Sequence, residues 1–490
     1  MQGGRPNILH ATEHMKAQAL RPVPHLEKRR LMQQTPAIDL DATAGSGPTG
    51  VLARWIAHHE TVPPSGVALV WARHVLLDWL ACGIAGASEP LVRILVDAYA
   101  GPAAQGTTVI ASNRKAGPLE AALINGSAGH ALDYDDVSPR MVGHPTAPLA
   151  PAALAVAQQL GASGPDLLQA LVVGHEVAAR IGEHLGASHY QQGFHTTGTI
   201  GTFAAAAACA RLYRLNSTQA THCLALAATQ AAGLKGMFGT MAKPLHAGKA
   251  AMNGLMAAQL AARGFTGQAA AIEGAQGFAQ TQALRHEPFP NRFDTRLGFG
   301  IESTLFKYHA ACFLTHPTIE AVRQVRQTHG IGLDEMATLA IEVTGPHRGV
   351  CDIDEPVTGL NVKFSIRQLA VLALDGADTA SLALYSDATA LDPRYALARQ
   401  RVSFQVVDAQ VLGDQASRVT VQTRDGRTLT ATADVGSPAR DLDAQWQRLV
   451  AKAEAIALPV LGPQRFAQLL QAVAGLDQAP SIDSLLEAIA

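Results

Sequence analysis

The feature that most constrains this chain is a series of alanine- and glycine-rich segments between residues 50 and 300, in which apolar residues recur every three or four positions. Such spacing is typical of helices, and small side chains let neighbouring helix axes approach closely. Helices of this composition are expected to be buried on several sides. We therefore predict a large all-helical domain that contains the segments 65–86, 151–161, 165–186, 198–215, 217–234 and 249–264.

The pattern changes near residue 330. β-Branched residues alternate in segments 336–345 and 401–408, and segment 418–434 carries an Asp-Gly hairpin signal between two alternating runs. Helical runs at 363–376 and 387–401 lie between these strands, and helical spacing returns in 443–457 and 462–476. We predict a mainly α protein with an α+β insert: a helical domain formed by residues 46–305 and 440–490, and an α+β lid domain at 306–439.

Composition narrows the classes of partner. Only 16% of the residues are charged, against about 25% in typical globular proteins, which predicts a large buried core and a subunit interface, most simply that of a homodimer. A net charge of −2 gives no basic excess for binding nucleic acid or an acidic membrane surface. The five scattered cysteines lack C-x-x-C spacing, which argues against zinc ribbons and disulfide frameworks and fits a reducing cytoplasm.

Two further expectations concern targeting. Residues 1–45 lack the apolar core of a secretory signal, and we expect a weakly ordered extension or a tail that packs on a partner subunit. No uninterrupted apolar run reaches the roughly 18 residues of a spanning helix, so we predict no membrane association.

The stretch "HALDYDDVSPRMVGHP" gathers acidic and imidazole groups in an otherwise apolar region. It has three interpretations: a metal site, an acid–base site, or the solvated end of a helix. A magnesium site of the prenyl-transfer type would need a second carboxylate-rich motif, and no zinc spacing is clear. We predict a metal-free site in which Asp133 orients a histidine, while Asp135 and Asp136 cap or form structural pairs.

Three other segments concentrate polar groups. His195 directly precedes a Thr/Gly-rich helix start, where free N–H groups favour an anion, although Thr196 or Thr197 simply capping a helix is the simpler interpretation. Lys243 precedes a proline, and His246 precedes a helix opened by glycine; a lysine there could bind a carboxylate or be an ordinary solvated side chain. The junction with the insert carries Lys307, His309, Cys312 and His316.

These segments, in order, resemble the MmgE/PrpD family: "NGSAGHALDYDD", "GHPTAP", "GFHTTGTIGTFAAA", "FGTMAKPLHAGKAAMNG", "IEGAQGF", "LFKYHAACFLTHPTIEAV" and "VKFSIRQLAVLALDG". The resemblance covers about residues 50 to 490. The family includes 2-methylcitrate dehydratase, cis-aconitate decarboxylase and iminodisuccinate epimerase. The resemblance implies a helical domain with an inserted α+β lid, homodimeric assembly, and catalysis that needs no metal or organic cofactor.

The resemblance also implies site residues. It places Asp133, His144, His195, Lys243 and Lys307 in an active site for proton transfer at a carbon next to a carboxylate. We expect His144 to be the acid/base, assisted by Asp133, with His195 as its partner or a carboxylate ligand. Positive charge would hold the developing anion. The catalytic set is thus His144, Asp133, His195 and Lys243, and the substrate-binding set is Lys307, Thr196, His246 and Cys312.

This chain departs from the family pattern at several positions. Val137 stands where many members have threonine, Cys312 where the decarboxylase branch has histidine, and Leu369 where tyrosine is frequent; the spacer "VSPRMV" is shorter than in the dehydratase branch. We expect a hydro-lyase that dehydrates a 2-methylcitrate-like hydroxy polycarboxylate. The alternatives are an epimerase or isomerase, a decarboxylase on a di- or tricarboxylate, and a catalytically silent carboxylate-binding paralogue.

Overall fold

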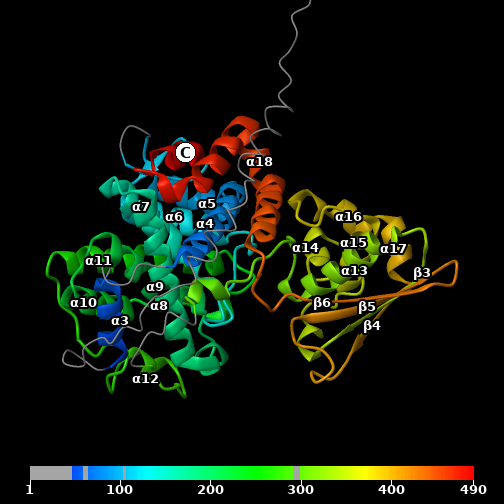
Figure 1. Ribbon diagram of the computed structural model, residues 1–490, viewed down its shortest axis with the longest axis horizontal. Helices are drawn as coiled ribbons and strands as arrows, with labels where there is room; N and C mark the ends of the chain where they lie inside the picture. The colour runs from blue at the N-terminus through cyan, green and yellow to red at the C-terminus, as the bar shows by residue number, and fades with distance from the viewer. Residues whose placement is uncertain (1–46, 59–64, 103–105, 291–297) are drawn as a thin grey trace, which may run out of the picture. The chain divides into compact units, whose positions relative to one another are not determined.

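A computed structural model describes residues 47–58, 65–102, 106–290 and 298–490 (Figure 1). The predicted extension at 1–45 lies outside these residues. The chain divides into two compact units, Met1–Phe306 with Arg440–Ala490, and Lys307–Ala439. The first is helical and the second combines helices with a mixed sheet, so the predicted mainly α class with an α+β part is confirmed.

Twelve α-helices make up most of the described part of the first unit. Helix α11 lies at its centre, because it contacts α6, α7, α9 and α10. The α-helices are α3 (Pro48–Ala57), α4 (Gly66–Gly86), α5 (Pro90–Tyr99), α6 (Pro118–His130), α7 (Thr146–Leu160), α8 (Gly164–Gln191), α9 (Thr196–Leu212), α10 (Ser217–Ala228), α11 (Ala242–Ala262), α12 (Phe278–Gln282), α18 (Leu442–Ala474) and α19 (Asp483–Ile489), and the short strands are β1 (Thr107–Thr108) and β2 (Lys115–Ala116).

Glycines set the separation of these helices. A Cβ at Gly126 of α6 would lie 2.9 Å from the Cα of Gly248 in α11, and one at Gly254 of α11 would lie 2.6 Å from the Cβ of Ala205 in α9. Both distances are shorter than real Cβ contacts, so only glycine fits without movement. The small residues therefore let α6 and α9 both pack closely against α11, and the end of α6 and the start of α9 carry polar residues of one site.

Helix α4, predicted at 65–86, bears on the expectation of no membrane association, which stays a prediction. Its 21 residues make it long and apolar enough to cross a membrane by length and composition, although 78% of its most apolar window is buried inside the protein. Arg73, His74 and Asp78 interrupt its apolar residues, so the helix contains no uninterrupted apolar run of that length. A core helix passes the same test, and α4 packs against α6, α7, α8 and α18.

The second unit is a four-stranded sheet with helices on one face (Figure 1). The strand order is β4-β3-β5-β6, with β3 and β4 parallel and the other pairs antiparallel. The predicted hairpin joins β5 to β6 and has Gly426 at φ 91°. The elements are α13 (His316–His329), β3 (Met336–Val343), α14 (Gly359–Val362), α15 (Ile366–Asp375), α16 (Asp387–Leu391), α17 (Pro393–Arg399), β4 (Val402–Val406), β5 (Ala416–Thr423) and β6 (Thr428–Asp434).

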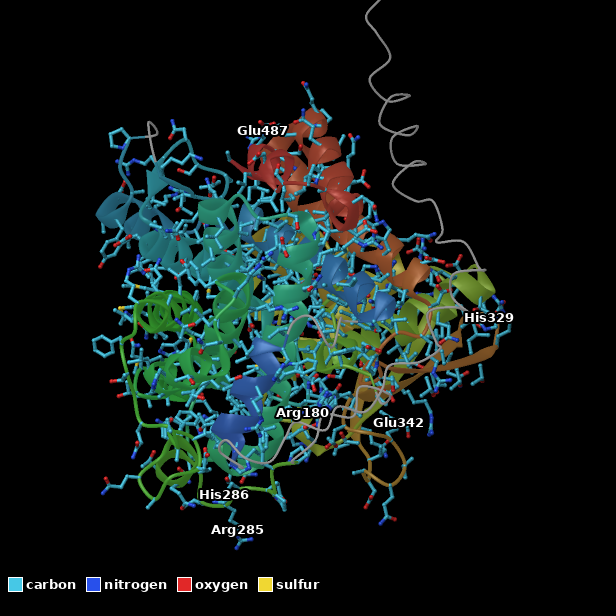
Figure 2. The ribbon with its side chains drawn as sticks, turned by 60° about the vertical axis from the view of Figure 1, so that its left-hand side comes forward. Arg180, Arg285, His286, His329, Glu342 and Glu487 are labelled. Carbon is cyan, nitrogen blue, oxygen red and sulfur yellow. The ribbon has the colours of Figure 1, made fainter. Side chains whose placement is uncertain are left out.

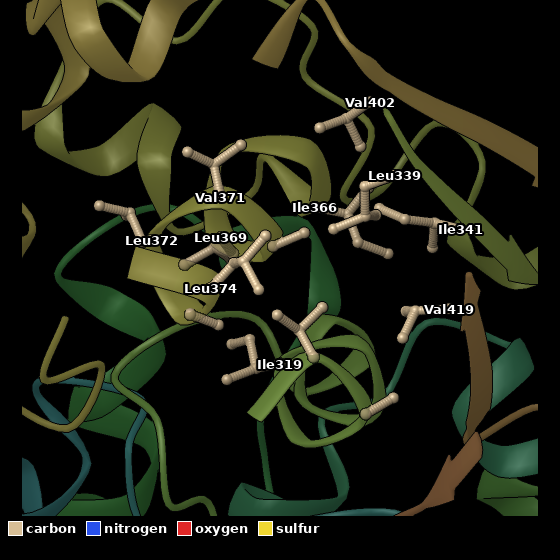
Figure 3. Packing of buried hydrophobic residues seen from close by; sticks show 14 of the residues in the cluster. Ile319, Leu339, Ile341, Ile366, Leu369, Val371, Leu372, Leu374, Val402 and Val419 are labelled. Carbon is tan, nitrogen blue, oxygen red and sulfur yellow. The ribbon is translucent and has the colours of Figure 1, made fainter. Parts of the chain in front are cut away.

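Helix α13 packs against β5, β6 and α15, and Figure 3 shows Ile319, Leu369 and Val419 in the core between them. The helix expected at 387–401 is two helices. Asp392 accepts a hydrogen bond from the N–H of Arg394 and Pro393 begins α17, so the chain turns where a new cap and a proline coincide. Exposed charged residues such as Arg285, His286 and Glu487 lie on the outside (Figure 2).

A buried ion pair joins the two chain segments of the first unit. Lys452 of α18 donates to Oδ1 of Asp78 in α4 at 2.6 Å and to the carbonyl of Tyr134 at 2.7 Å. Its side chain is 1% exposed and that of Asp78 is fully buried. The ammonium also lies 4.0 Å from the centre of the Tyr134 ring. The C-terminal helix is therefore held to α4 and to the backbone that follows α6.

Removing one partner of this pair should destabilise the protein strongly, because the other charge is left buried. We expect Lys452→Met to lower the free energy of unfolding by about 3–5 kcal/mol. The double variant Asp78→Asn/Lys452→Met should be less destabilised, because no isolated buried carboxylate remains. Thermal unfolding of the three proteins checks this. A double variant with a lower melting temperature than the single one would contradict the assignment.

Candidate active site

The segment that follows α6 folds back on itself and carries most of the polar groups. Val137 and Leu305 exchange two backbone hydrogen bonds of 2.8 Å, and Ser138 pairs with Gly143 across a tight turn. Asp133, at the start of the segment, has φ 51°, a left-handed conformation that aspartate tolerates better than most residues. The fold-back brings His144 next to the aspartates eleven and nine positions before it.

Asp135 lies between two imidazoles. Nδ1 of His130 is 2.9 Å from its Oδ1, and Nδ1 of His144 is 3.2 Å from its Oδ2. The side chains of His130 and Asp135 are fully buried, and that of His144 is 12% exposed. Burial lowers the pKa of His130 to about 4. Burial also opposes ionisation of Asp135, yet His130 and His144 hold its pKa well below the ordinary value.

Asp133 faces the other side of His144. Its Oδ1 is 2.8 Å from Nζ of Lys243 and 3.5 Å from Nε2 of His144. Its side chain is 49% exposed, so this carboxylate is the accessible one of the set. The expectation that Asp133 alone orients the histidine is incomplete, because Asp135 lies closer and on the buried side. His144 thus has one ring nitrogen near each carboxylate.

The start of α9 fixes the position of His144. The N-cap residue is His195, and its side chain makes no capping bond. Thr197 Oγ1 accepts from the backbone N–H of His144 at 3.1 Å, and Thr196 Oγ1 donates to the carbonyl of Val142 at 2.6 Å. The interpretation of these threonines as simple helix caps is therefore wrong. Both hold the segment that carries His144.

Gly143 permits this close approach. A Cβ at this position would lie 2.5 Å from Thr196 Oγ1 and 3.2 Å from the backbone N of Thr197. Any larger residue would push His144 away from α9. The Gly-His pair of the sequence therefore has a steric reason, which the residue pattern alone did not show.

His195 and His246 form a second imidazole pair. Their Nδ1 atoms are 3.0 Å apart, and the edge of Phe238 meets the His195 ring at a centroid distance of 4.9 Å. Burial lowers the pKa of His195 to about 2, and the charges of His130 and Lys243 act in the same direction. The expectation for His246 needs one correction: α11 begins at Ala242, so His246 lies within the helix, not before a glycine-opened one.

The remaining predicted residues belong to the second unit. Lys307 and Cys312 lie in the segment before α13, and their part in substrate binding stays a prediction. His309 has a local role there: its Nδ1 is 2.7 Å from Thr379 Oγ1 and its Nε2 is 3.0 Å from Glu320 Oε1. These contacts are those of a structural histidine.

Sequence reasoning missed several residues of the site. His130 and Asp135 were visible in the motif but had no assigned partner, because the fold-back that pairs them is not a local pattern. Asp136, the next residue along the chain, is buried and accepts a hydrogen bond from Thr146 Oγ1 at 2.7 Å. Lys452 lies far along the chain, and its contact with the Tyr134 carbonyl has no local signal in the sequence.

The spacing of the cluster would also suit a divalent cation. His130, Asp133, Asp135 and His144 each offer a donor atom, and these atoms lie within 4.8 Å of one another. The same oxygens already contact positive or hydrogen-bonding groups: Asp133 contacts Lys243, and Asp135 contacts two imidazoles. A cation would have to displace these contacts, so metal independence stays our prediction.

Comparison with known proteins identifies the family. Residues 50–288 match the MmgE/PrpD N-terminal domain, and residues 309–478 match the MmgE/PrpD C-terminal domain. The chain belongs to the MmgE/PrpD family. The site described above falls within the N-terminal match, apart from the contribution of Lys452, which lies within the C-terminal one.

Several MmgE/PrpD relatives carry one activity in their names. The chain is 26% identical to a cis-aconitate decarboxylase of Aspergillus terreus over 474 residues, which are 91% of this chain and 96% of the relative. It is 29% identical to the cis-aconitate decarboxylase-like protein oryM of Aspergillus oryzae over 59% of this chain and 64% of the relative. It is 27% identical to a human cis-aconitate decarboxylase over 52% and 55%. The matched relatives are lyases, which places this MmgE/PrpD chain in an enzyme family.

The lowered histidine pKa values predict acid sensitivity. Four described histidines have a pKa moved from 6.5 to about 4 or below: His74, His130, His175 and His195. Between pH 6.5 and about 4 the unfolded chain binds protons at these positions and the folded chain does not, so the free energy of unfolding rises with pH. Each histidine contributes up to about 1.4 kcal/mol per pH unit.

Burial raises the pKa of Asp78 to about 6 and that of Asp136 well above its ordinary value. These two carboxyl groups make the free energy of unfolding fall as the pH rises, opposite to the histidines. Because the histidines outnumber them, we expect the melting temperature to fall from pH 7 to pH 5. Differential scanning calorimetry at several pH values measures it. His175→Gln should make the dependence shallower, and a melting temperature that rises toward pH 5 would contradict the prediction.

Metal independence is tested by chelation. We expect dialysis against EDTA to leave turnover unchanged, because the carboxylates of the cluster already have Lys243 and imidazole partners. The measurement is the rate of substrate turnover before and after dialysis, with Mg²⁺ and Zn²⁺ added back separately. Activity that disappears with EDTA and returns with one of these ions would show that the cluster holds a metal.

Proposed function

We propose that this protein is a lyase that acts on a small di- or tricarboxylate, and that decarboxylation of cis-aconitate is its reaction. The observation that carries the proposal is the arrangement around Asp133: an accessible carboxylate beside His144 and Lys243, with buried His195 close by. The names of the relatives support the choice of reaction, and one of them matches over 91% of this chain.

The chemistry of decarboxylation fits these groups. Loss of CO₂ leaves an electron pair on carbon, delocalised toward a neighbouring carboxylate, and a proton must then reach a carbon atom. Lys243 supplies a positive charge near the growing anion, and Lys307 is the second cation we propose for this role. An imidazole that donates a proton completes the reaction. Asp135, ionised and buried, holds the Nδ1 side of His144, which leaves Nε2 for acid–base work.

Dehydration of a 2-methylcitrate-like hydroxy acid is the second candidate. It would use the same groups, with a proton removed from carbon and a hydroxyl group protonated as it leaves. Cys312 favours this alternative, since the decarboxylase branch has histidine there. Epimerisation would need acid–base groups on both faces of one carbon, and His144 and His195 are the pair that would supply them.

The test is proton NMR in D₂O with the purified protein and cis-aconitate, citrate, 2-methylcitrate and iminodisuccinate. We expect cis-aconitate to lose CO₂ and the product to gain one deuterium at carbon. His144→Asn should lower the rate by at least about 10²-fold, because an acid–base group is removed. His222→Asn, a half-buried histidine of α10 outside the site, is the matched control and should keep the rate.

Other outcomes decide between the candidates. An alkene formed from citrate or 2-methylcitrate without loss of CO₂ would replace the decarboxylase by a dehydratase. Deuterium entry with inversion alone would indicate an epimerase. A folded protein that changes none of the four acids would contradict the proposed function.

A further inference from the structure

Decarboxylation has a requirement that dehydration and epimerisation lack. A carboxylate leaves as CO₂ and a proton takes its place on carbon, so each turnover consumes one proton from water. Dehydration and epimerisation only move a proton that the substrate already carries. A buried neutral imidazole that gives this proton to carbon therefore needs a second proton at its other nitrogen in the same event, and it is reprotonated from water once the product has left.

His195 cannot store the proton as a cation. Its residue is 3% exposed, and burial together with the charges of His130, Lys243, His144 and His246 lowers its pKa to about 2. A neutral imidazole that donates a proton from one nitrogen must gain one at the other nitrogen in the same event, or it becomes an anion. Nδ1 of His195 lies 3.0 Å from Nδ1 of His246, so Nε2 is the nitrogen left for a reacting carbon.

We propose that His246 is the proton relay of the site, passing protons between water and Nδ1 of His195. Two facing Nδ1 atoms at this distance share one proton, because one ring must donate and the other accept. His246 is half-buried whereas His195 is 3% exposed, so His246 is the ring of the pair that is more accessible to water. This inference rests on the proposed function. It names His195, the partner of His144 in the site, as the imidazole that protonates carbon, and it assigns His246 a role different from substrate binding.

The steps balance with both rings neutral before and after. Water gives a proton to Nε2 of His246, the Nδ1 proton of His246 passes to Nδ1 of His195, and the Nε2 proton of His195 forms the new C–H bond with the electron pair left by CO₂. After the product leaves, water protonates Nε2 of His195, the shared proton returns to His246, and His246 releases its Nε2 proton. The net change is one proton consumed per CO₂ released.

The backbone makes room for this pair. A Cβ at Gly198 of α9 would lie 3.1 Å from the Cβ of His246 and 2.5 Å from the carbonyl of Ala232. A Cβ at Gly233, which has φ 158°, would lie 3.4 Å from the Cβ of His195. Glycine at position 198 lets α9 approach α11 closely enough for the two rings to meet, whereas Gly233, outside both helices, only contacts His195. The packing of two helices therefore fixes the contact between His195 and His246.

The experiment compares His246→Asn and His246→Ala with the wild type, using cis-aconitate. Asparagine keeps a polar group near the Nδ1 position but cannot pass a proton through. We expect kcat to fall by about 10²-fold in both variants with KM little changed. Added imidazole should raise kcat of His246→Ala and leave His246→Asn unchanged. His222→Asn, with the same added imidazole, is the matched control.

Two results would overturn the relay. One is an unchanged kcat in His246→Asn. The other is a large rise in KM with kcat preserved, which would make His246 a substrate ligand.

Nitrogen-15 NMR of histidine-labelled protein tests the pair without any substrate. We expect the Nδ1 shifts of His195 and His246 to lie between those of protonated and unprotonated imidazole nitrogens, because the pair exchanges between its two neutral tautomers as water adds and removes protons at the outer Nε2 atoms. Fixed tautomers would overturn the relay even in an active enzyme. Exchange in a protein that leaves every acid unchanged would instead overturn the proposed function and keep the relay.

Discussion

The site depends on the hydrogen bonds of one buried ammonium group, that of Lys452. It is buried, donates to Asp78 in α4, and donates to the carbonyl of Tyr134, the residue between Asp133 and Asp135. A buried charge is tolerated only when it is paired and hydrogen-bonded. The C-terminal helix must therefore return to α4 for either charge to be satisfied, and its return also fixes the backbone that carries the site aspartates. The position of the last chain segment and the geometry of the site therefore depend on the same contact.

Asp133, Asp135 and Asp136 are close in sequence but have different roles, because each has a different environment. Asp135 is held ionised by two imidazoles, whereas burial and the charges of Asp78 and Asp135 raise the pKa of Asp136 well above its ordinary value. Two carboxylates adjacent in sequence thus have opposite preferences for a proton. Asp133 differs from both, because it is half-exposed and contacts Lys243. Only this third carboxylate is placed to meet a substrate.

The sequence predicts most of the fold because the signals are local. Helical spacing, alternation and an Asp-Gly turn each act within a few residues, and the helical first unit and the hairpin of β5 and β6 follow them. Two errors also have local causes: Pro393 divides one expected helix, and α11 begins at Ala242, before the glycine that was expected to open it. The site is less predictable, because the pairing of Asp135 with His130 and His144 depends on a fold-back. The contact of Lys452 depends on a segment more than 300 positions away.

The fold-back itself stores strain. Asp133 has φ 51° and Val142 has φ 53°, a conformation that is unfavourable for a β-branched residue. Such strain persists only where surrounding contacts fix it. Thr196 holds the carbonyl of Val142, Thr197 holds the N–H of His144, and Lys452 holds the carbonyl next to Asp133. The two strained residues stand at the ends of the segment and aim Asp133 and His144 at each other. The helical core therefore positions the site residues through three hydrogen bonds to one short stretch of backbone.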